Sequence, residues 1–166
     1  MTRILGIDPG SVITGYGVVD VEGNKTRHVK SGFLKLSKGE LPVRLGEIYH
    51  QLSDIISELK PEEFAIEQVF VAKNASSALK LGQARGAAIC AAASSNLDVY
   101  EYTPTQVKQA IVGRGRADKT QIQHMMGVLL GLRETLQPDQ ADALAVAVCH
   151  AHTRQTLQHT RNTAQK

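Results

Sequence analysis

Residues 3–21 read RILGIDPGSVITGYGVVDV and contain the patterns of two β-strands joined by a turn. Arg3 to Ile7 is a short apolar run that ends at an Asp-Pro-Gly turn, which is typical of a buried strand. Ile13 to Val21 is rich in β-branched residues and glycine, and after a Glu-Gly-Asn turn an extended segment continues to Leu36. The pattern predicts three consecutive strands joined by tight turns, which form an antiparallel meander.

The sequence that follows alternates helical and strand patterns. Apolar residues recur at steps of three and four between Leu41 and Leu59, which predicts an amphipathic helix that Pro61 ends. Asp118 followed by Gln121 is the signature of a capped helix start. Crossover β-α-β units would extend the meander, so we expect an α/β fold with a mixed five-stranded sheet flanked by helices on both faces. The remaining predicted elements are strands over 63–69 and 99–102 and helices over 76–95, 104–112, 118–130 and 138–152.

The composition is that of an ordinary globular protein of 166 residues, with 42% hydrophobic and 21% charged residues. This length predicts one domain with its own core, and the polar residues 154–166 are expected to form a frayed or disordered tail. The apolar stretches fall short of the roughly 20 residues that cross a bilayer, and the N-terminus has no signal-peptide pattern. Cys90 and Cys149 lie far apart, which argues against a disulfide framework or a cysteine zinc site and predicts a cytoplasmic location.

The positive charge is concentrated in the middle of the chain. The formal net charge is +3, but residues 1–67 carry 8 Lys and Arg against 10 Asp and Glu, and residues 68–133 carry 8 against 3. Residues 134–166 carry 3 of each sign. The excess in the middle segment fits either a solvated surface or a face that contacts nucleic-acid phosphates.

Four carboxylates stand at positions that could meet in the fold. Asp8 closes the first strand, and Glu67 ends the fourth strand on the same pleat face as Ala65. Asp139 and Asp142 are three residues apart on one side of the last helix, and Asp142 shares its apolar face. Each acid alone also fits a plain structural position, as a turn residue, an exposed strand end or a partner of the helix dipole. Together they can converge on one cluster.

Such a cluster favours divalent cations. Four neighbouring carboxylates raise one another's pKa values unless cations neutralise them. Oxygen ligands without Cys or His favour Mg²⁺, with Mn²⁺ as a substitute, over zinc. Two ions, about 3.5–4 Å apart in two-metal sites generally, stabilise the attacking and departing oxygens of phosphodiester cleavage. The six histidines are scattered and are expected on the surface or in core packing.

Five motifs, in one order and at compatible spacing, resemble the RuvC-type Holliday junction resolvases of bacteria. They are IDPGS with TGYG, AIEQVFVAKNA, SALKLGQARG, the pair QVKQ and GRGRADK, and DQADALAVA. The resemblance extends from about Thr2 to His152. It implies a ribonuclease H-like nuclease domain over residues 1–153, followed by the tail over 154–166.

The resemblance also implies an activity. Asp8, Glu67, Asp139 and Asp142 would be the catalytic, metal-binding acids, with two Mg²⁺ ions expected per active site. A homodimer would bind a four-way DNA junction and resolve it by paired symmetrical nicks with metal-activated water, in homologous recombination and DNA repair. Its partner would be a branch-migration motor of the RuvA and RuvB type. Some relatives carry histidine in place of one acid of the last helix, whereas this sequence has Asp at both positions.

Residues of the basic segment gain possible roles from the resemblance. Phe70 could stack on an unpaired base, or pack in the core beside its valine neighbours. Lys108 and Lys119 could neutralise charge at the scissile phosphate, or be ordinary surface lysines. Gly82 and Gly86 could serve a twofold dimer contact, or close packing of their own helix on the sheet. The expected DNA contacts are Phe70, Lys73, Asn74, Lys80, Arg85, Lys108, Arg114, Arg116 and Lys119.

Two other functions remain open at the level of sequence. A fragment of an actin- or chaperone-like ATP-binding domain would share the sheet and open with a D-x-G-S hairpin, but such proteins need two lobes and 166 residues provide one. A junction-binding module without catalytic activity would share the whole fold. The complete set of four acids argues against that second alternative.

Overall fold

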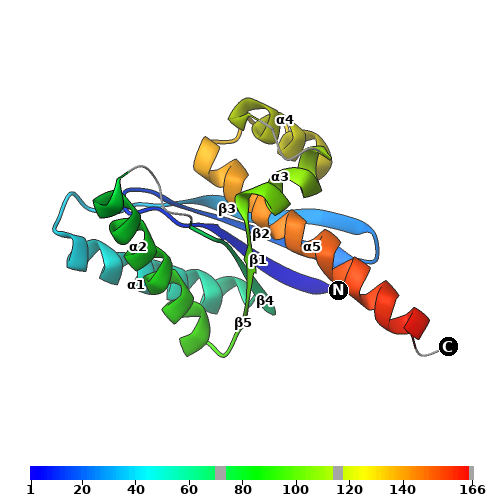
Figure 1. Ribbon diagram of the computed structural model, residues 1–166, viewed down its shortest axis with the longest axis horizontal. Helices are drawn as coiled ribbons and strands as arrows, with labels where there is room; N and C mark the ends of the chain where they lie inside the picture. Colours follow the sequence, from blue (N-terminus) through cyan, green and yellow to red (C-terminus); the bar gives the residue numbers. More distant parts are fainter. Residues whose placement is uncertain (70–73, 114–117, 165–166) are drawn as a thin grey trace.

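The computed structural model describes residues 1–69, 74–113 and 118–164, with side chains as far as Arg154. The chain begins with three strands, continues with helices and strands in turn, and ends with three helices (Figure 1). The strands are β1 (Thr2–Asp8), β2 (Thr14–Glu22), β3 (Lys25–Leu34), β4 (Glu63–Glu67) and β5 (Asp98–Tyr102). The helices are α1 (Leu41–Leu59), α2 (Ala75–Ser94), α3 (Pro104–Val112), α4 (Lys119–Leu130) and α5 (Pro138–Ala164).

The strands form one five-stranded mixed sheet in the order β3-β2-β1-β4-β5. The first three strands pair antiparallel, as the predicted meander requires. β4 pairs parallel to β1, and β5 pairs parallel to β4, with α1 and α2 as the crossover helices. The predicted sheet is therefore confirmed, and the parallel pairs bring the carboxyl ends of β1, β4 and β5 to one edge.

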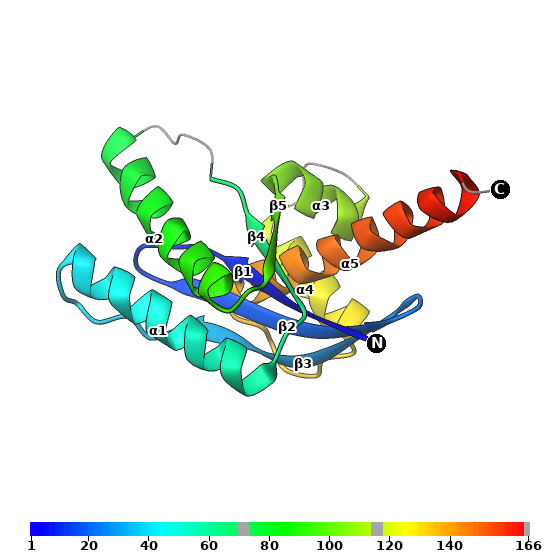
Figure 2. The same cartoon turned by 90° about the horizontal axis from the view of Figure 1, so that it is seen from below.

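Both faces of the sheet are covered by helices (Figures 1 and 2). Successive side chains of a strand point to opposite faces, so Ile4 and Leu5 of β1 enter two different cores. Leu5 packs in the core that α1 and α2 close, whereas Ile4 packs in the core under α5. Helices α3 and α4 lie over α5 and complete that second layer.

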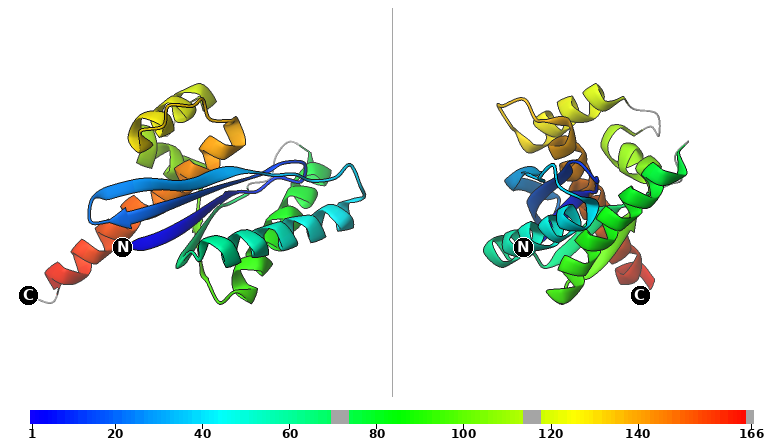
Figure 3. Two further views of the ribbon diagram at one scale, coloured as in Figure 1. Left: turned by 180° about the vertical axis from the view of Figure 1, so that it is seen from behind. Right: turned by 90° about the vertical axis from the view of Figure 1, so that its left-hand side faces the viewer.

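The end of the chain differs from the prediction. A helix end near His152 was expected, but α5 continues to Ala164. The division into a nuclease domain over 1–153 and a tail over 154–166 stays a prediction. Residues 153–164 contain neither Gly nor Pro, so nothing in the covalent chain stops the helix. Its last turns extend beyond the sheet (Figure 3, left). Among the described residues, no helix is both long enough and apolar enough to span a membrane.

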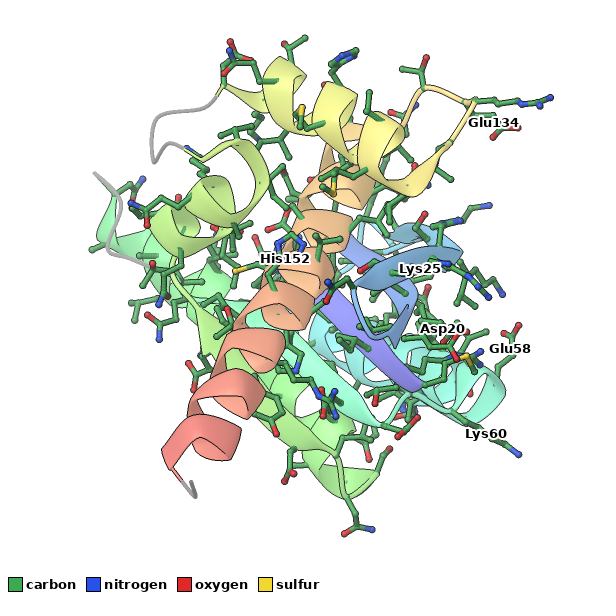
Figure 4. The ribbon with its side chains drawn as sticks, turned by 90° about the vertical axis from the view of Figure 1, so that its right-hand side faces the viewer. Asp20, Lys25, Glu58, Lys60, Glu134 and His152 are labelled. Atoms are coloured by element: carbon green, nitrogen blue, oxygen red, sulfur yellow. The ribbon has the colours of Figure 1, made fainter. Side chains whose placement is uncertain are left out.

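A buried histidine connects α5 to the sheet. His150 Nδ1 lies 2.7 Å from the Tyr102 hydroxyl, and its Nε2 lies 2.8 Å from a carboxyl oxygen of Glu63. Burial lowers the pKa of His150, so the neutral ring is favoured. The prediction placed this residue on the surface or in core packing, and the structure buries it as a hydrogen-bonded link. His152, two residues later, is exposed on α5 (Figure 4).

Candidate active site

Asp8 and Glu67 lie side by side because their strands are parallel neighbours. Ile7 of β1 pairs with Ile66 of β4, so the next residue of each strand reaches the same edge of the sheet. Ala65 is buried in the core under α5, and Glu67, two residues later, is on that same face. The right panel of Figure 3 looks onto this edge, with α3 and α4 on one side of the sheet and α1 and α2 on the other.

The loop after Asp8 is closed by a buried hydroxyl. Thr14 Oγ1 donates a hydrogen bond of 2.8 Å to the carbonyl oxygen of Gly10 and accepts one of 3.2 Å from the Gly10 N–H. Thr14 is fully buried. These two bonds fix the turn between β1 and β2 and thereby the place where Asp8 leaves the sheet.

Helix α5 brings the other two acids to the same edge. Asp139 lies in the first turn of the helix, where its charge complements the helix dipole. Asp142 follows one turn later, and its side chain is 21% exposed. Gln140 Oε1 accepts a hydrogen bond of 3.1 Å from the Gln137 N–H, which satisfies a backbone donor just before the helix begins.

A pocket of about 200 Å³ gathers most of the predicted catalytic acids. Three of the four acids line it, Asp8, Glu67 and Asp142. Asp139 is outside the lining, but its charge acts on Asp8. Lys108 and Lys119 also line the pocket, together with the α4 cap residue Asp118. Asp118 forms the predicted capping box with Gln121.

The pKa values of three acids, Asp8, Glu67 and Asp142, are raised above their ordinary values. Burial, followed by the charges of Glu67, Asp142 and Asp139, raises the pKa of Asp8 to about 8. Burial, followed by the charge of Asp142, raises the pKa of Glu67 to about 7. Burial also raises the pKa of Asp142, against the lowering effect of Lys119. Near neutral pH these acids cannot all ionise unless positive charge is added.

The donor set has the chemistry of a hard-cation site. The carboxylates supply only oxygen ligands, which suit Mg²⁺ and Mn²⁺. Within the described part of the chain, however, no three His, Cys, Asp or Glu side chains form a ready-made metal-binding group. Lys119 Nζ lies 3.8 Å from Asp142 Oδ2 and supplies one positive charge at the pocket. The role of the four acids as metal ligands remains a prediction.

The predicted DNA contacts are in different surroundings. Lys80 is exposed on α2, and Asn74 caps that helix by accepting hydrogen bonds from the N–H groups of Ser76 and Ser77. This capping role is sufficient to account for an asparagine at position 74, and its contact with DNA stays a prediction. Four further predicted contacts lie outside the described residues: Phe70, Lys73, Arg114 and Arg116.

Arg85 supports the acid at the end of β4. Its Nε donates a hydrogen bond of 3.1 Å to the backbone carbonyl of Glu67, and its Nη2 is ion-paired with Glu101. Arg85 was expected to contact a DNA phosphate, and no sequence pattern indicates its hydrogen bond to Glu67. Glu67 and Arg85 are 18 positions apart, so only the folded chain brings them together.

The exposed side of α2 resolves one of the open alternatives. A Cβ placed on Gly82 or Gly86 would meet no atom within 4 Å, so neither glycine is needed for the packing of α2 within the chain. Ala84, Ala88 and other alanines of the opposite side do that packing. A cavity of about 540 Å³ adjoins this exposed side, and Leu79 on its wall is 70% exposed.

The fold and the site together define a class of protein. A mixed sheet of this order, with helices on both faces and acids at the ends of β1 and β4 and at the start of α5, is a ribonuclease H-like nuclease domain. The chain matches the family model of crossover junction endodeoxyribonuclease RuvC over residues 4–150. It therefore belongs to the RuvC family, as its motifs predict.

Individual relatives agree with this assignment. Crossover junction endodeoxyribonuclease RuvC of Shewanella pealeana is 60% identical over 157 residues, which cover 95% of this chain and 91% of that protein. The enzyme of the same name from Aeromonas salmonicida is 58% identical over the same shares of both chains. The structure of Thermus thermophilus RuvC in complex with a Holliday junction substrate has a TM-score of 0.88 and 36% identity, covering 94% of this chain and 96% of that one.

Proposed function

We propose that this chain is a structure-selective endodeoxyribonuclease that resolves four-way DNA junctions by paired symmetrical nicks in recombination and repair. The observation that carries the proposal is the convergence of Asp8, Glu67 and Asp142 on one pocket with two lysines. The solved relative with a TM-score of 0.88 was determined in complex with a Holliday junction substrate. An ATP-binding domain fragment is not favoured by any of these observations.

The acids of the pocket fit two Mg²⁺ ions, for which Mn²⁺ is the expected substitute. Asp8 and Glu67 reach the pocket from the sheet, and Asp142 reaches it from α5, with Asp139 beside them. Bound Mg²⁺ ions supply a polarised phosphate and an activated water in sites of this kind. The raised pKa values of Asp8 and Glu67 favour cation binding, because a bound cation stabilises the ionised carboxylates and reduces the repulsion between them.

The lysines of the pocket act on the phosphate. Lys119 is 77% exposed, so its ammonium group can turn from Asp142 toward a bound phosphodiester. Lys108 lines the same pocket, and its charge acts on both Glu67 and Asp142. Positive charge at this place stabilises the negative charge that develops on the scissile phosphate.

Paired nicks require two such pockets in one assembly. A homodimer supplies them, and the open side of α2 offers a surface for the twofold contact, because Gly82 and Gly86 allow another helix to approach closely. Exposed Leu79 gives this surface apolar area to bury. A branch-migration motor of the RuvA and RuvB type is the expected partner of the dimer on the junction.

A synthetic mobile four-way junction tests the proposal directly. Each of the four strands is end-labelled in turn and incubated with the protein, with and without Mg²⁺. Mg²⁺-dependent nicks at symmetrical positions in two strands of like polarity, with linear duplex left intact, are the expected result. Junction binding without nicks would favour the non-catalytic module, and tight ATP binding without cleavage would favour the ATP-binding fragment.

A further inference from the structure

Gly15 lies between two of the four acids. It pairs with Asp8 across the antiparallel β1–β2 ladder. On the face covered by α5, a Cβ built on Gly15 would lie 2.0 Å from the carbonyl oxygen of Asp139 and 3.3 Å from the Cβ of Asp139. The backbone of the first turn of α5 therefore rests directly on Gly15, next to the strand residue Asp8.

The same turn is held from the far side of β2. Gln140, the residue after Asp139, donates a hydrogen bond of 2.9 Å from its Nε2 to the hydroxyl of Ser31 on β3. Ser31 Oγ is also 2.7 Å from His28 Nε2. Because β3 flanks β2 on the side away from β1, these bonds keep the turn seated over Gly15.

We propose that Gly15 is a positioning residue for the nuclease reaction, because the absence of a side chain there lets Asp139 reach the same cations as Asp8. This inference rests on the proposed function, in which the acids hold divalent metal. A methyl group at Gly15 would lie 2.0 Å from the carbonyl oxygen of Asp139, whereas ordinary contact begins at 3.4 Å. The first turn of α5 would therefore have to move away from β2 by roughly 1.4 Å. Mg²⁺ requires ligands at about 2.0–2.1 Å in near-octahedral geometry, so a shift of that size removes a ligand.

Gly17 provides a matched control on the same strand. A Cβ on Gly17 would lie 2.8 Å from the backbone nitrogen of Leu144 and from its side chain, so Gly17→Ala also presses on α5. This steric clash involves Leu144, five residues after Asp139, and part of it is with a side chain that can change its rotamer. A purely structural effect of glycine replacement predicts similar losses for both variants. A positioning role predicts a loss of metal affinity for Gly15→Ala alone.

The experiment measures the affinity of the full chain for Mn²⁺ alone by isothermal titration calorimetry, with Tm and junction binding recorded for every variant. Gly15→Ala is expected to weaken Mn²⁺ binding at least about tenfold while junction binding is retained, and Gly17→Ala is expected to stay within about threefold of the wild type. Asp139→Ala should cause no further loss in the Gly15→Ala background, since Gly15 acts through Asp139. Asp139→Glu, which adds one methylene of reach, should restore part of the affinity in that background.

Four results would overturn the proposal. If Mn²⁺ affinity survives Gly15→Ala, or falls equally in Gly17→Ala, Gly15 has no special role, while metal binding by the wild type still supports the proposed metal site. Absence of Mn²⁺ binding by the wild type removes the metal site and this role with it. If Gly15→Ala does not fold, Ser31→Ala is the second variant, because it removes the hydrogen bond between β3 and the same turn. An unchanged Mn²⁺ affinity in Ser31→Ala counts against the proposal, and a loss of about threefold supports it.

Discussion

Lys119 Nζ lies 3.8 Å from Asp142 Oδ2, which pairs the start of α4 with the first turns of α5 across the acidic pocket. The charge of the lysine acts to lower the pKa values of Asp142, Asp8 and Glu67, against the raising effect of burial. The lysine is also 77% exposed. An exposed ion pair of this kind adds little to stability, so its value to the protein lies in the chemistry of the pocket.

Lys119→Ala should therefore separate activity from stability. We expect single-turnover cleavage of a four-way junction to fall about 10²- to 10³-fold, because one electrostatic stabiliser of the transition state is lost. The free energy of unfolding should change by less than about 1 kcal/mol. Lys25→Ala on the exposed edge of β3 is the matched control and should leave both quantities unchanged (Figure 4). If Lys119→Ala cleaves the junction within twofold of the wild-type rate, Lys119 is an ordinary surface lysine with no role in catalysis.

Asp8 makes the metal-free protein sensitive to pH. Its pKa is about 8 in the folded protein against 3.8 for the ordinary side chain, so between about pH 4 and pH 8 the folded state holds a proton that the unfolded chain has lost. This contribution lowers stability as the pH rises through that window, at up to about 1.4 kcal/mol per unit.

Asp8→Asn removes that penalty. In EDTA at pH 8, Asp8→Asn should raise Tm by several degrees, and at pH 4 its effect should be small, as measured by thermal unfolding. Asp54→Asn, on the exposed side of α1, is the control and should leave the pH profile of Tm unchanged. A Tm difference between Asp8→Asn and the wild type that does not grow from pH 4 to pH 8 would contradict the raised pKa of Asp8.

Two roles of Arg85 can be distinguished: a structural role through its hydrogen bond to the Glu67 carbonyl, and a contact with DNA. Its bonds to the Glu67 carbonyl and to Glu101 predict that Arg85→Ala lowers the free energy of unfolding by about 1–2 kcal/mol. The salt dependence of junction binding should keep its slope, since the guanidinium is already bonded within the protein. Lys80→Ala, on the exposed side of the same helix, should show the opposite pattern, with unchanged stability and a slope reduced by about one. A reduced slope for Arg85→Ala would establish the phosphate contact.

The open side of α2 gives a prediction for assembly. Gly82→Leu should leave the protomer as stable as before or more stable, because no atom lies within 4 Å of the added Cβ and leucine favours a helix over glycine by up to about 1 kcal/mol. The same change should dissociate the proposed dimer, as measured by sedimentation velocity. Gly46→Leu is the matched control, since Gly46 is a helical glycine of α1 with equally open surroundings. Dimers that persist in Gly82→Leu would place the twofold contact elsewhere.

The sequence predicted that acids from separate elements could converge. Asp8 and Glu67 end apolar strands, Asp142 interrupts an apolar helix face, and the structure brings these three acids to one pocket. Their catalytic and metal-binding roles stay predictions. The capping box of Asp118 and Gln121 is equally local and was predicted correctly. Such features depend on neighbours within a few positions along the chain.

Features that join distant parts of the chain were missed. Arg85 reaches Glu67 across 18 positions, and His150 reaches Tyr102 across 48, and no local pattern marks either pair. The length of α5 was underestimated for another reason: polar composition suggested a tail, whereas the chain to Ala164 lacks the glycine or proline that would end a helix. The contact of Gly15 with Asp139 likewise depends on how closely α5 lies on β2.

We propose that the carboxylates of this pocket form a metal-dependent centre for junction cleavage. Asp8→Asn and Asp142→Asn keep the size of each side chain and remove its charge, and Glu134→Gln, on the exposed loop that follows α4, is the control (Figure 4). The decisive measurement is the Mg²⁺-dependent single-turnover rate of nicking of a mobile four-way junction, taken with the Kd for the same junction in EDTA. We expect the nicking rate of both Asn variants to fall at least about 10³-fold, with a Kd within a few-fold of the wild type. Glu134→Gln should have the wild-type rate and Kd. Nicking at the wild-type rate by either Asn variant, or loss of junction binding together with nicking, would contradict this proposal.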